Sequence, residues 1–248
     1  MPEPCEARFI ISNNAFIAFS QLPVSNYKFM KSYFGSSLAL LILATGLSPA
    51  LAQKGMGEIN INGQLVMAAR AGRVERVTAL LAEGAKVNSR DRNGDSALNM
   101  AAASGNSALV DVLIKQGADI DLANLAGVTP LMGAAYNGKP DNVERLLAAG
   151  AKPEPLDRVR KNAAIYAAGT GCSKCLQALL QAGMSPDAVF DNDLTLLMWA
   201  SGYGQEATVR LLLAKGADRT RKDARGKTAA DMARENKHPE VVALIEQQ

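Results

Sequence analysis

An apolar pattern with helical spacing recurs along most of the 248-residue chain. An aliphatic residue is followed three positions later by an aliphatic doublet, and this arrangement occurs five times. The five copies are Val77 with Leu80-Leu81, Val110 with Leu113-Ile114, Val143 with Leu146-Leu147, Leu176 with Leu179-Leu180, and Val209 with Leu212-Leu213. Apolar side chains at positions i, i+3 and i+4 lie on one face of an α-helix. Each copy therefore predicts an amphipathic helix that packs against another element.

Glycines and an apolar landmark give the pattern a fixed period. In each copy an apolar residue stands seven positions before a glycine, and a second glycine follows twelve positions after the first. The landmark residues are Leu65, Leu98, Leu131, Ala164 and Leu197, with Ala230 one step further on. They lie 33 residues apart without an insertion. The chain is therefore a tandem repeat, with five copies and a sixth that runs to the C-terminus.

The sequence of one unit predicts two short helices. Thr129 and Pro130 form a helix start, because the hydroxyl accepts from free backbone N–H groups and proline has no donor to lose. Small alanines follow, so a short inner helix can lie close to its neighbours. Gly138 ends this helix, and the amphipathic outer helix that carries Val143 runs to Gly150. Such a helix–turn–helix unit is too small to bury its own apolar face, so the units are expected to stack.

The period and the segment GVTPLMGAAYNG, Gly127 to Gly138, resemble the ankyrin repeat. The resemblance spans residues 63–248 and implies an all-α solenoid. In it, about six helix–turn–helix units stack, joined by β-turn or hairpin-like loops, with the first and last units as caps. The fourth unit reads RKNAAIYAA where the family has Gly-x-Thr-Pro-Leu, so its turn is expected to be less regular. Lys237 replaces the first glycine of the last unit.

The N-terminal segment has the pattern of a secretory signal. From Met30, a lysine, an apolar run over residues 38–47 and the small residues Ala50 and Ala52 match the charged region, apolar region and cleavage site of a signal peptide. Residues 30–52 are therefore predicted to be removed, residues 1–29 to be an over-long extension, and residues 53–62 to be a linker. An uncleaved anchor is the alternative, but a spanning helix needs about 20 apolar residues. The expected location is periplasmic or secreted, with no integral membrane span after cleavage.

Charge does not point to a nucleic acid or an anionic membrane as the partner. The chain has 27 basic and 24 acidic side chains, and 24 and 22 remain after residues 1–52 are removed. No nucleic acid partner is expected from so balanced a chain. Two local basic clusters, residues 158–161 and 219–227, are interpreted as solvated loops, with an anion-binding patch as the alternative.

Cys172 and Cys175 are the cysteines that remain once the leader, which contains Cys5, is removed. They open the outer helix of the fourth unit, in a compartment expected to be oxidising. Their spacing allows a local disulfide or a pair of inert thiols. A redox-active pair, with a thiolate stabilised by the helix N-terminus, is the second possibility. A metal site would need further ligands and is not expected. A disulfide between the two residues is the prediction carried forward.

The sequence contains no recognisable catalytic motif. The single histidine is His238, in the terminal cap. The metalloprotease pattern HExxH, the nucleophile elbow G-x-S-x-G and the complete phosphate-loop pattern G-x-x-x-x-G-K-[ST] do not occur. Without a histidine base, the serines and carboxylates form no recognisable triad. A binding protein without a cofactor is therefore expected rather than an enzyme.

The resemblance places the partner surface on the concave side, formed by the loop tips ahead of each unit and the exposed ends of the inner helices. Candidate protein-binding residues, carried over by position, are Arg92, Asn93, Leu125, Tyr136, Asn137, Arg158, Lys161, Asn192 and Tyr203. Tyrosine and arginine are enriched in interface hot spots. The alternative is that Tyr136 and Tyr203 only cover apolar stems. Tyr166 and Trp199 lie two residues after their landmarks and are expected to pack in the core.

The sequence therefore predicts an exported scaffold that binds another protein, of unknown identity, through its concave face. The alternative is a redox-linked accessory factor in oxidative-stress defence that uses Cys172 and Cys175. That alternative depends on a resemblance, because exported bacterial ankyrin-repeat proteins have been associated with tolerance of oxidative stress.

Overall fold

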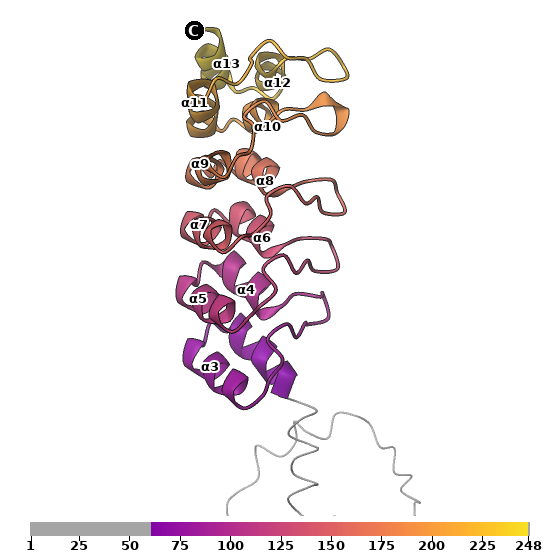
Figure 1. Cartoon of the computed structure of the whole chain (residues 1–248). Coiled ribbons are helices and arrows are strands. Elements are labelled where there is room, and N and C mark those ends of the chain that lie inside the picture. The colour runs from indigo at the N-terminus through magenta and orange to yellow at the C-terminus, as the bar shows by residue number, and fades with distance from the viewer. Residues whose placement is uncertain (1–60, 248) are drawn as a thin grey trace, which may run out of the picture. The chain divides into compact units, whose positions relative to one another are not determined.

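The computed structural model describes residues 61–247 of the chain (Figure 1). The predicted extension 1–29, the predicted signal peptide 30–52 and residues 53–60 of the predicted linker lie outside the described residues. Residues 61 and 62, the last two of that linker, belong to a helix that covers residues 61–70. The helical repeats therefore begin no later than residue 61.

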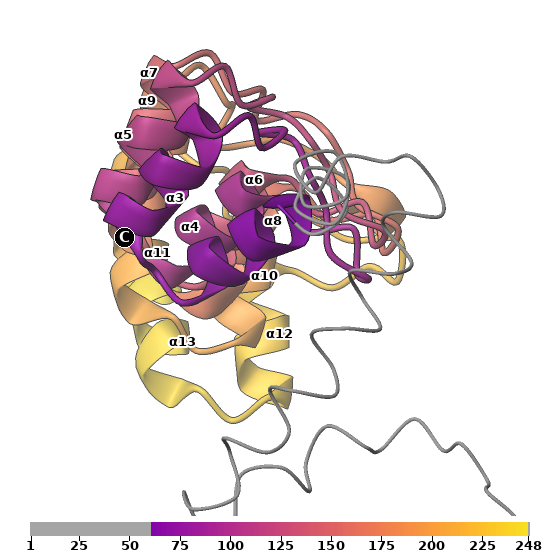
Figure 2. The ribbon, with the colours of Figure 1, turned by 90° about the horizontal axis from the view of Figure 1, so that it is seen from below.

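Two columns of short helices form the stack, and the chain alternates between them (Figures 1 and 2). The inner helices are 61–70, α4 (Ala97–Ser104), α6 (Pro130–Tyr136), α8 (Ala163–Thr170), α10 (Leu196–Gly202) and α12 (Ala229–Glu235). The outer helices are α3 (Val74–Ala82), α5 (Ser107–Lys115), α7 (Pro140–Ala148), α9 (Ser173–Gln181), α11 (Glu206–Ala214) and α13 (Pro239–Glu246). The loops project from the inner column, as Figure 1 shows. Residues 61–247 hold two isolated β-bridges and no strand. The predicted all-α solenoid is confirmed.

Each inner helix from α4 onward begins after an N-cap residue whose side chain accepts a hydrogen bond from a backbone N–H of the first turn. The Thr129 hydroxyl accepts from the N–H of Met132 at 3.3 Å, and proline follows at the first helical position. In the fourth unit, Asn162 takes the same role and accepts from the N–H of Ile165 at 3.0 Å. Ser, Thr and Asn at this position satisfy one of the free N–H groups of the helix end. The helix starts predicted from the sequence therefore also form where the Thr-Pro pair is missing.

The core lies between the two columns. The paired alanines of α4, α6 and α8 are completely buried, which lets successive inner helices approach closely. The first residue of each outer doublet is buried as well, whereas the second residue is only partly buried. No helix within residues 61–247 is long and apolar enough to cross a membrane.

An acidic or amide side chain closes each regular loop. In the loop ahead of the second unit, the Asp91 carboxylate accepts from the backbone of Asn93 at 2.7 Å and Asp95 at 2.9 Å. At the same place in later loops, the side-chain oxygens of Asn124, Asp157 and Asp223 accept equivalent bonds from backbone N–H groups. Such side-chain bonds to the backbone two residues on stabilise a turn.

The expectation of a less regular fourth turn is wrong. Asp157 closes that turn like its counterparts, and Arg160 adopts the positive φ (62°) that glycine adopts in regular loops. The irregular loop is the fifth, because Phe190 stands where the others have Asp or Asn. There the chain forms the short helix η3 (Asp191–Asp193), with positive φ at both Asn192 and Asp193. A pairing of Arg160 with the Asp191 carboxylate, at 3.0 and 3.2 Å, joins the fourth and fifth loops.

Candidate functional site

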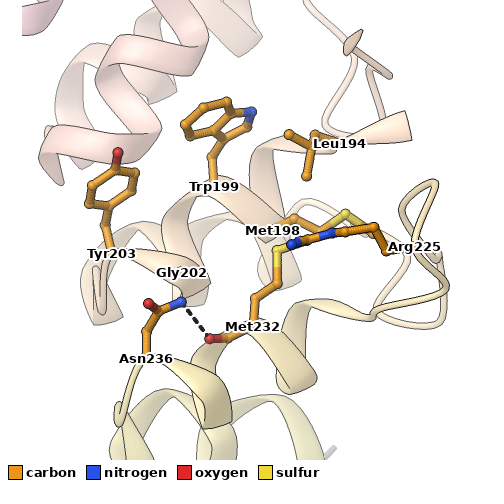
Figure 3. Close-up of a pocket in the computed structure, with 8 residues that line it drawn as sticks. All are labelled: Leu194, Met198, Trp199, Gly202, Tyr203, Arg225, Met232 and Asn236. Carbon is orange, nitrogen blue, oxygen red and sulfur yellow. Dashed lines mark hydrogen bonds between the residues drawn. The ribbon is translucent and has the colours of Figure 1, made fainter. Parts of the chain in front are cut away.

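Three recesses follow one another along the inner helices. The first, of about 450 Å³, lies beside α4 and α6, and its lining includes Asn99, Ala103, Val128, Gly133, Tyr136 and Tyr166. The middle recess, of about 370 Å³, is lined by residues that include Tyr136, Lys161, Tyr166, Gly169, Trp199 and Tyr203. The third, of about 330 Å³, includes Leu194, Met198, Trp199, Tyr203, Arg225 and Met232 (Figure 3). Neighbouring recesses share side chains, so together they form one groove.

Aromatic side chains separate the recesses. The rings of Tyr136 and Tyr166 meet edge to face, with centroids 5.4 Å apart and planes at 78°. Trp199 of α10 and Tyr203, the C-cap residue of that helix, lie about one helical turn apart, with centroids 6.1 Å apart and planes at 8°. Edge-to-face and offset parallel arrangements are the favoured geometries of aromatic pairs. The Tyr136–Tyr166 pair and the Trp199–Tyr203 pair therefore form the two ends of the middle recess.

Glycines of the inner helices lie close to side chains of neighbouring units. A Cβ added at Gly169 would lie 3.6 Å from ring atoms of Tyr203, an ordinary van der Waals distance, so the ring lies close against α8. At Gly133 a Cβ would lie 3.5 Å from that of Ala103. Each of α6, α8 and α10 carries one aromatic residue and one glycine at two positions three residues apart. The order is reversed in α6, where Gly133 precedes Tyr136, and this reversal brings Tyr136 beside Tyr166.

A lysine lies over the aromatic walls of the middle recess. The Lys161 ammonium is 4.8 Å from the centroid of the Trp199 ring and 5.8 Å from that of Tyr166. Both distances fall within the range of cation–π attraction. Within residues 61–247, Lys161 forms no ion pair. The ammonium therefore lies over the two rings without a hydrogen-bond acceptor among the described residues.

Tyr166 is fixed by a buried carboxylate. Its hydroxyl donates to Asp157, which also accepts from the backbone N–H groups of Val159 and Lys161 at 2.9 Å. Burial, and then the hydrogen bond to the Asp157 carboxylate, raise the pKa of Tyr166 above its ordinary range. The ring is therefore a neutral wall of the recess, and its hydroxyl is already used.

The third recess combines methionine, aromatic and arginine side chains (Figure 3). Two methionines, Met198 and Met232, contribute unbranched thioether side chains that adapt to different shapes. Arg225 reaches this recess while pairing with the buried Asp223 carboxylate at 2.8 Å. The indole Nε1 of Trp199 is buried without a hydrogen-bond partner among the described residues. Figure 3 shows that nitrogen on the side of the ring that faces Leu194.

The predicted binding residues fall into two groups. Tyr136, Lys161 and Tyr203 meet in the middle recess, and Asn137 lines the first recess. The others are exposed at the loops and do not line these three recesses: Arg92, Asn93, Leu125, Arg158 and Asn192.

Tyr166 and Trp199 were expected to be packing residues, and the structure gives them two roles. Both are partly buried against the core, and both line the middle recess. The sequence signal that could have found them is the aromatic side chain at one repeat position, where Gly133, Tyr166 and Trp199 are spaced 33 residues apart and the other units have methionine.

The two cysteines form a disulfide in the structure, with Cα atoms 5.2 Å apart. Cys172 is the N-cap residue of α9, and its sulfur accepts from the N–H of Cys175 at 3.2 Å. Cys175 is completely buried, whereas Cys172 is partly exposed. Among the described residues, no group of three or more His, Cys, Asp or Glu side chains is placed to hold a metal ion.

Comparisons with known proteins agree with the repeat pattern. The sequence model described as "Ankyrin repeats (3 copies)" matches residues 65–157, 131–223 and 164–247. The structure of EF0377, an ankyrin repeat protein, is similar at 28% identity, covering 75% of this chain and 98% of its own, with a TM-score of 0.68. A second similar structure is a chain from the complex of the predatory endopeptidase Bd0816 of Bdellovibrio bacteriovorus with the immunity protein Bd3460. Its identity is 27%, the match covers 75% of this chain and 97% of that chain, and the TM-score is 0.68. No curated protein matches the chain.

Proposed function

Since this chain belongs to the ankyrin-repeat family, we propose that it is an exported scaffold that binds another protein through the groove. Ankyrin repeats generally mediate binding between proteins, and one similar chain occurs in a complex of an endopeptidase with an immunity protein. The groove offers side chains that folding does not require at these positions, because the units stack through their alanines and leucines.

One observation carries this proposal. Tyr136 and Tyr203 are 57% and 56% exposed, although each lies against another aromatic ring in the groove. Exposed aromatic surface inside a hollow is typical of an interaction site. Tyrosine also contributes a large contact area at a small cost in rotamer freedom.

The test is affinity capture with matched variants. The purified protein would be immobilised and incubated with an extract of the cell envelope, and bound proteins would be compared with those held by a Tyr136→Ala/Tyr203→Ala variant. Glu144→Ala, an exposed change on the outer helix α7, is the control. A protein held by the parent chain and the control, but lost from the double variant, supports the groove. A partner held equally by all three chains contradicts it.

Export is the second part of the proposal, and the signal-like segment 30–52 supports it. A periplasmic or secreted scaffold would meet its partner outside the cytoplasm. Fractionation of cells that produce the full chain tests this, because a protein found with cytoplasmic markers alone would contradict export.

A redox-linked accessory role is the second candidate, and the placement of the cysteines favours it. A partly exposed Cys172 at a helix N-terminus, beside a buried Cys175, is the arrangement in which one sulfur can be attacked and the other protected. Replacement of both cysteines by serine separates the two candidates. A scaffold keeps its partner after this change, whereas a redox factor loses its protective effect against oxidants.

A further inference from the structure

The middle recess contains hydrogen-bond donors that the fold does not use. Lys161 forms no ion pair within residues 61–247. The hydroxyls of Tyr136 and Tyr203 likewise make no hydrogen bond to the described residues, whereas the hydroxyl of Tyr166 donates to Asp157. An ammonium and two phenols therefore line a hollow whose walls are aromatic rings.

We propose that the middle recess binds a carboxylate side chain on an extended acidic segment of the partner protein, and that Lys161 selects for it. The inference rests on the proposed function, because it names the chemistry of the partner that the groove accepts.

The arrangement favours an anion over a second cation. Aromatic faces attract cations, but the faces of Trp199 and Tyr166 already carry the ammonium of Lys161. A basic partner side chain would meet a like charge at that position. A carboxylate instead gains a charge-assisted hydrogen bond from the ammonium, and such bonds are about twice as strong as neutral ones.

The buried carboxylate of the same loop, Asp157, forms no ion pair with Lys161. Asp157 is only 6% exposed, and it already accepts from the Tyr166 hydroxyl and from two backbone N–H groups. It therefore supports the wall and the turn. Because no acceptor among residues 61–247 pairs with the ammonium of Lys161, a group from outside the chain can do so.

The groove also favours a segment that passes through, rather than a chain end. The middle recess continues into the first recess past Tyr136 and Tyr166, and into the third past Trp199 and Tyr203. Packed helices lie about 8–10 Å apart. In an extended polyproline II segment, side chains i and i+3 point the same way and lie about 9 Å apart. Three such side chains can therefore enter three recesses in turn.

The first and third recesses determine which side chains of the partner segment can flank its carboxylate residue. The first recess has apolar surface from Ala103 and Val128, and the third from Leu194, Met198 and Met232. The expected motif is therefore an apolar residue, two variable residues, an Asp or Glu, two variable residues and a second apolar residue.

Selection from a library of random ten-residue peptides, displayed on phage and panned against the purified protein, tests this inference. Enriched peptides should share the acidic motif with apolar residues three positions away on both sides. Panning on Lys161→Met should retain the apolar preference and lose the acidic one, whereas Lys161→Arg should keep both. For one synthetic peptide carrying the motif, the Kd should rise about tenfold in Lys161→Met, as expected for loss of a hydrogen bond to a charged group. Its Kd should also rise with salt less steeply than for the parent chain.

The outcomes separate this inference from the proposed function. Enrichment of peptides without acidic residues, unchanged acidic preference in Lys161→Met, or no enrichment at all would overturn the inference. The proposed function is judged by capture of the cellular partner: if capture needs Tyr136 and Tyr203 but is unaffected by Lys161→Glu, only the acidic motif is wrong. Circular dichroism and thermal unfolding of Lys161→Met confirm that any change arises in a folded chain.

Discussion

The ammonium of Lys161 lies 4.8 Å from the centroid of the Trp199 ring, and the two residues belong to successive repeat units. The lysine comes from the loop ahead of α8 and the tryptophan from α10. The contact therefore exists only when these two units are stacked. It follows that the groove is a property of the array, and that a change that separates the units also disassembles the site.

The outer-helix doublets provide a test of the stacking. Leu146 is completely buried and Leu147 is only partly buried, so we expect their truncations to differ. Leu146→Ala should lower the free energy of unfolding by about 2–5 kcal/mol, because it removes buried methyl groups and leaves a cavity. Leu147→Ala should cost clearly less. Denaturant unfolding of both variants is the measurement, and equal losses would contradict the assigned core.

Lys237 occupies a backbone position that favours glycine. Its φ is 63°, close to the 62° of Gly138 at the corresponding place in an earlier unit. For a residue with a Cβ, this left-handed conformation costs about 1–2 kcal/mol. Lys237→Gly should therefore raise the free energy of unfolding by about 1 kcal/mol.

The reciprocal substitution, Gly138→Ala, is the control that measures the cost of the left-handed backbone conformation alone. No atom lies within 4 Å of a Cβ built at Gly138, so Gly138→Ala introduces no clash and should lower stability by about 1 kcal/mol. Thermal unfolding of both variants checks the pair. A destabilised Lys237→Gly would show that the lysine side chain contributes more than its backbone costs.

The repeat could be predicted from the sequence because stacking demands a regular pattern. The alanines of the inner helices and the first residue of each doublet face neighbours on both sides, so their burial follows from position. Turn regularity could not be predicted from glycine alone. Asp157 closes the fourth turn even though Arg160 stands at the glycine position, while Phe190 leaves the fifth turn without a closing side chain.

The groove could be predicted only in part. Tyr136 is the last residue of α6 and Tyr203 is the C-cap residue of α10, so their exposure follows from their places at the helix ends. Tyr166 and Trp199 stand at a position that is expected to be packed, and they reach the recess because they are larger than the glycine that α6 has there. The placement of Lys161 over two rings depends on side chains from two units, which no single repeat specifies.

The oxidation state of the cysteine pair in cells stays a prediction. In exported protein, Cys172 and Cys175 should both resist alkylation until a reductant is added, as shown by the intact mass. Because the loop between them is so short, the disulfide should add less stability than the roughly 3 kcal/mol of a 15-residue loop. Two thiols alkylated without reductant in freshly prepared protein would contradict the disulfide.

Processing of the N-terminus is a separate prediction. Cleavage after Ala52 should leave a mature chain that begins at or near Gln53, because small residues at positions 50 and 52 follow the apolar run. N-terminal sequencing of protein from the envelope fraction measures this. A mature chain that still contains residues 1–29 would contradict both the cleavage site and the start at Met30.

Binding through the groove is the central claim, and the equilibrium Kd of the captured partner for Tyr136→Ala and Tyr203→Ala tests it most directly. Each change should weaken binding by about 1–3 kcal/mol, the range of a genuine hot spot. The free energy of unfolding should change by no more than about 0.5 kcal/mol, because both side chains are largely exposed. Unchanged affinity in both variants, or a loss of affinity that only accompanies unfolding, would contradict the assignment of the groove as the binding site.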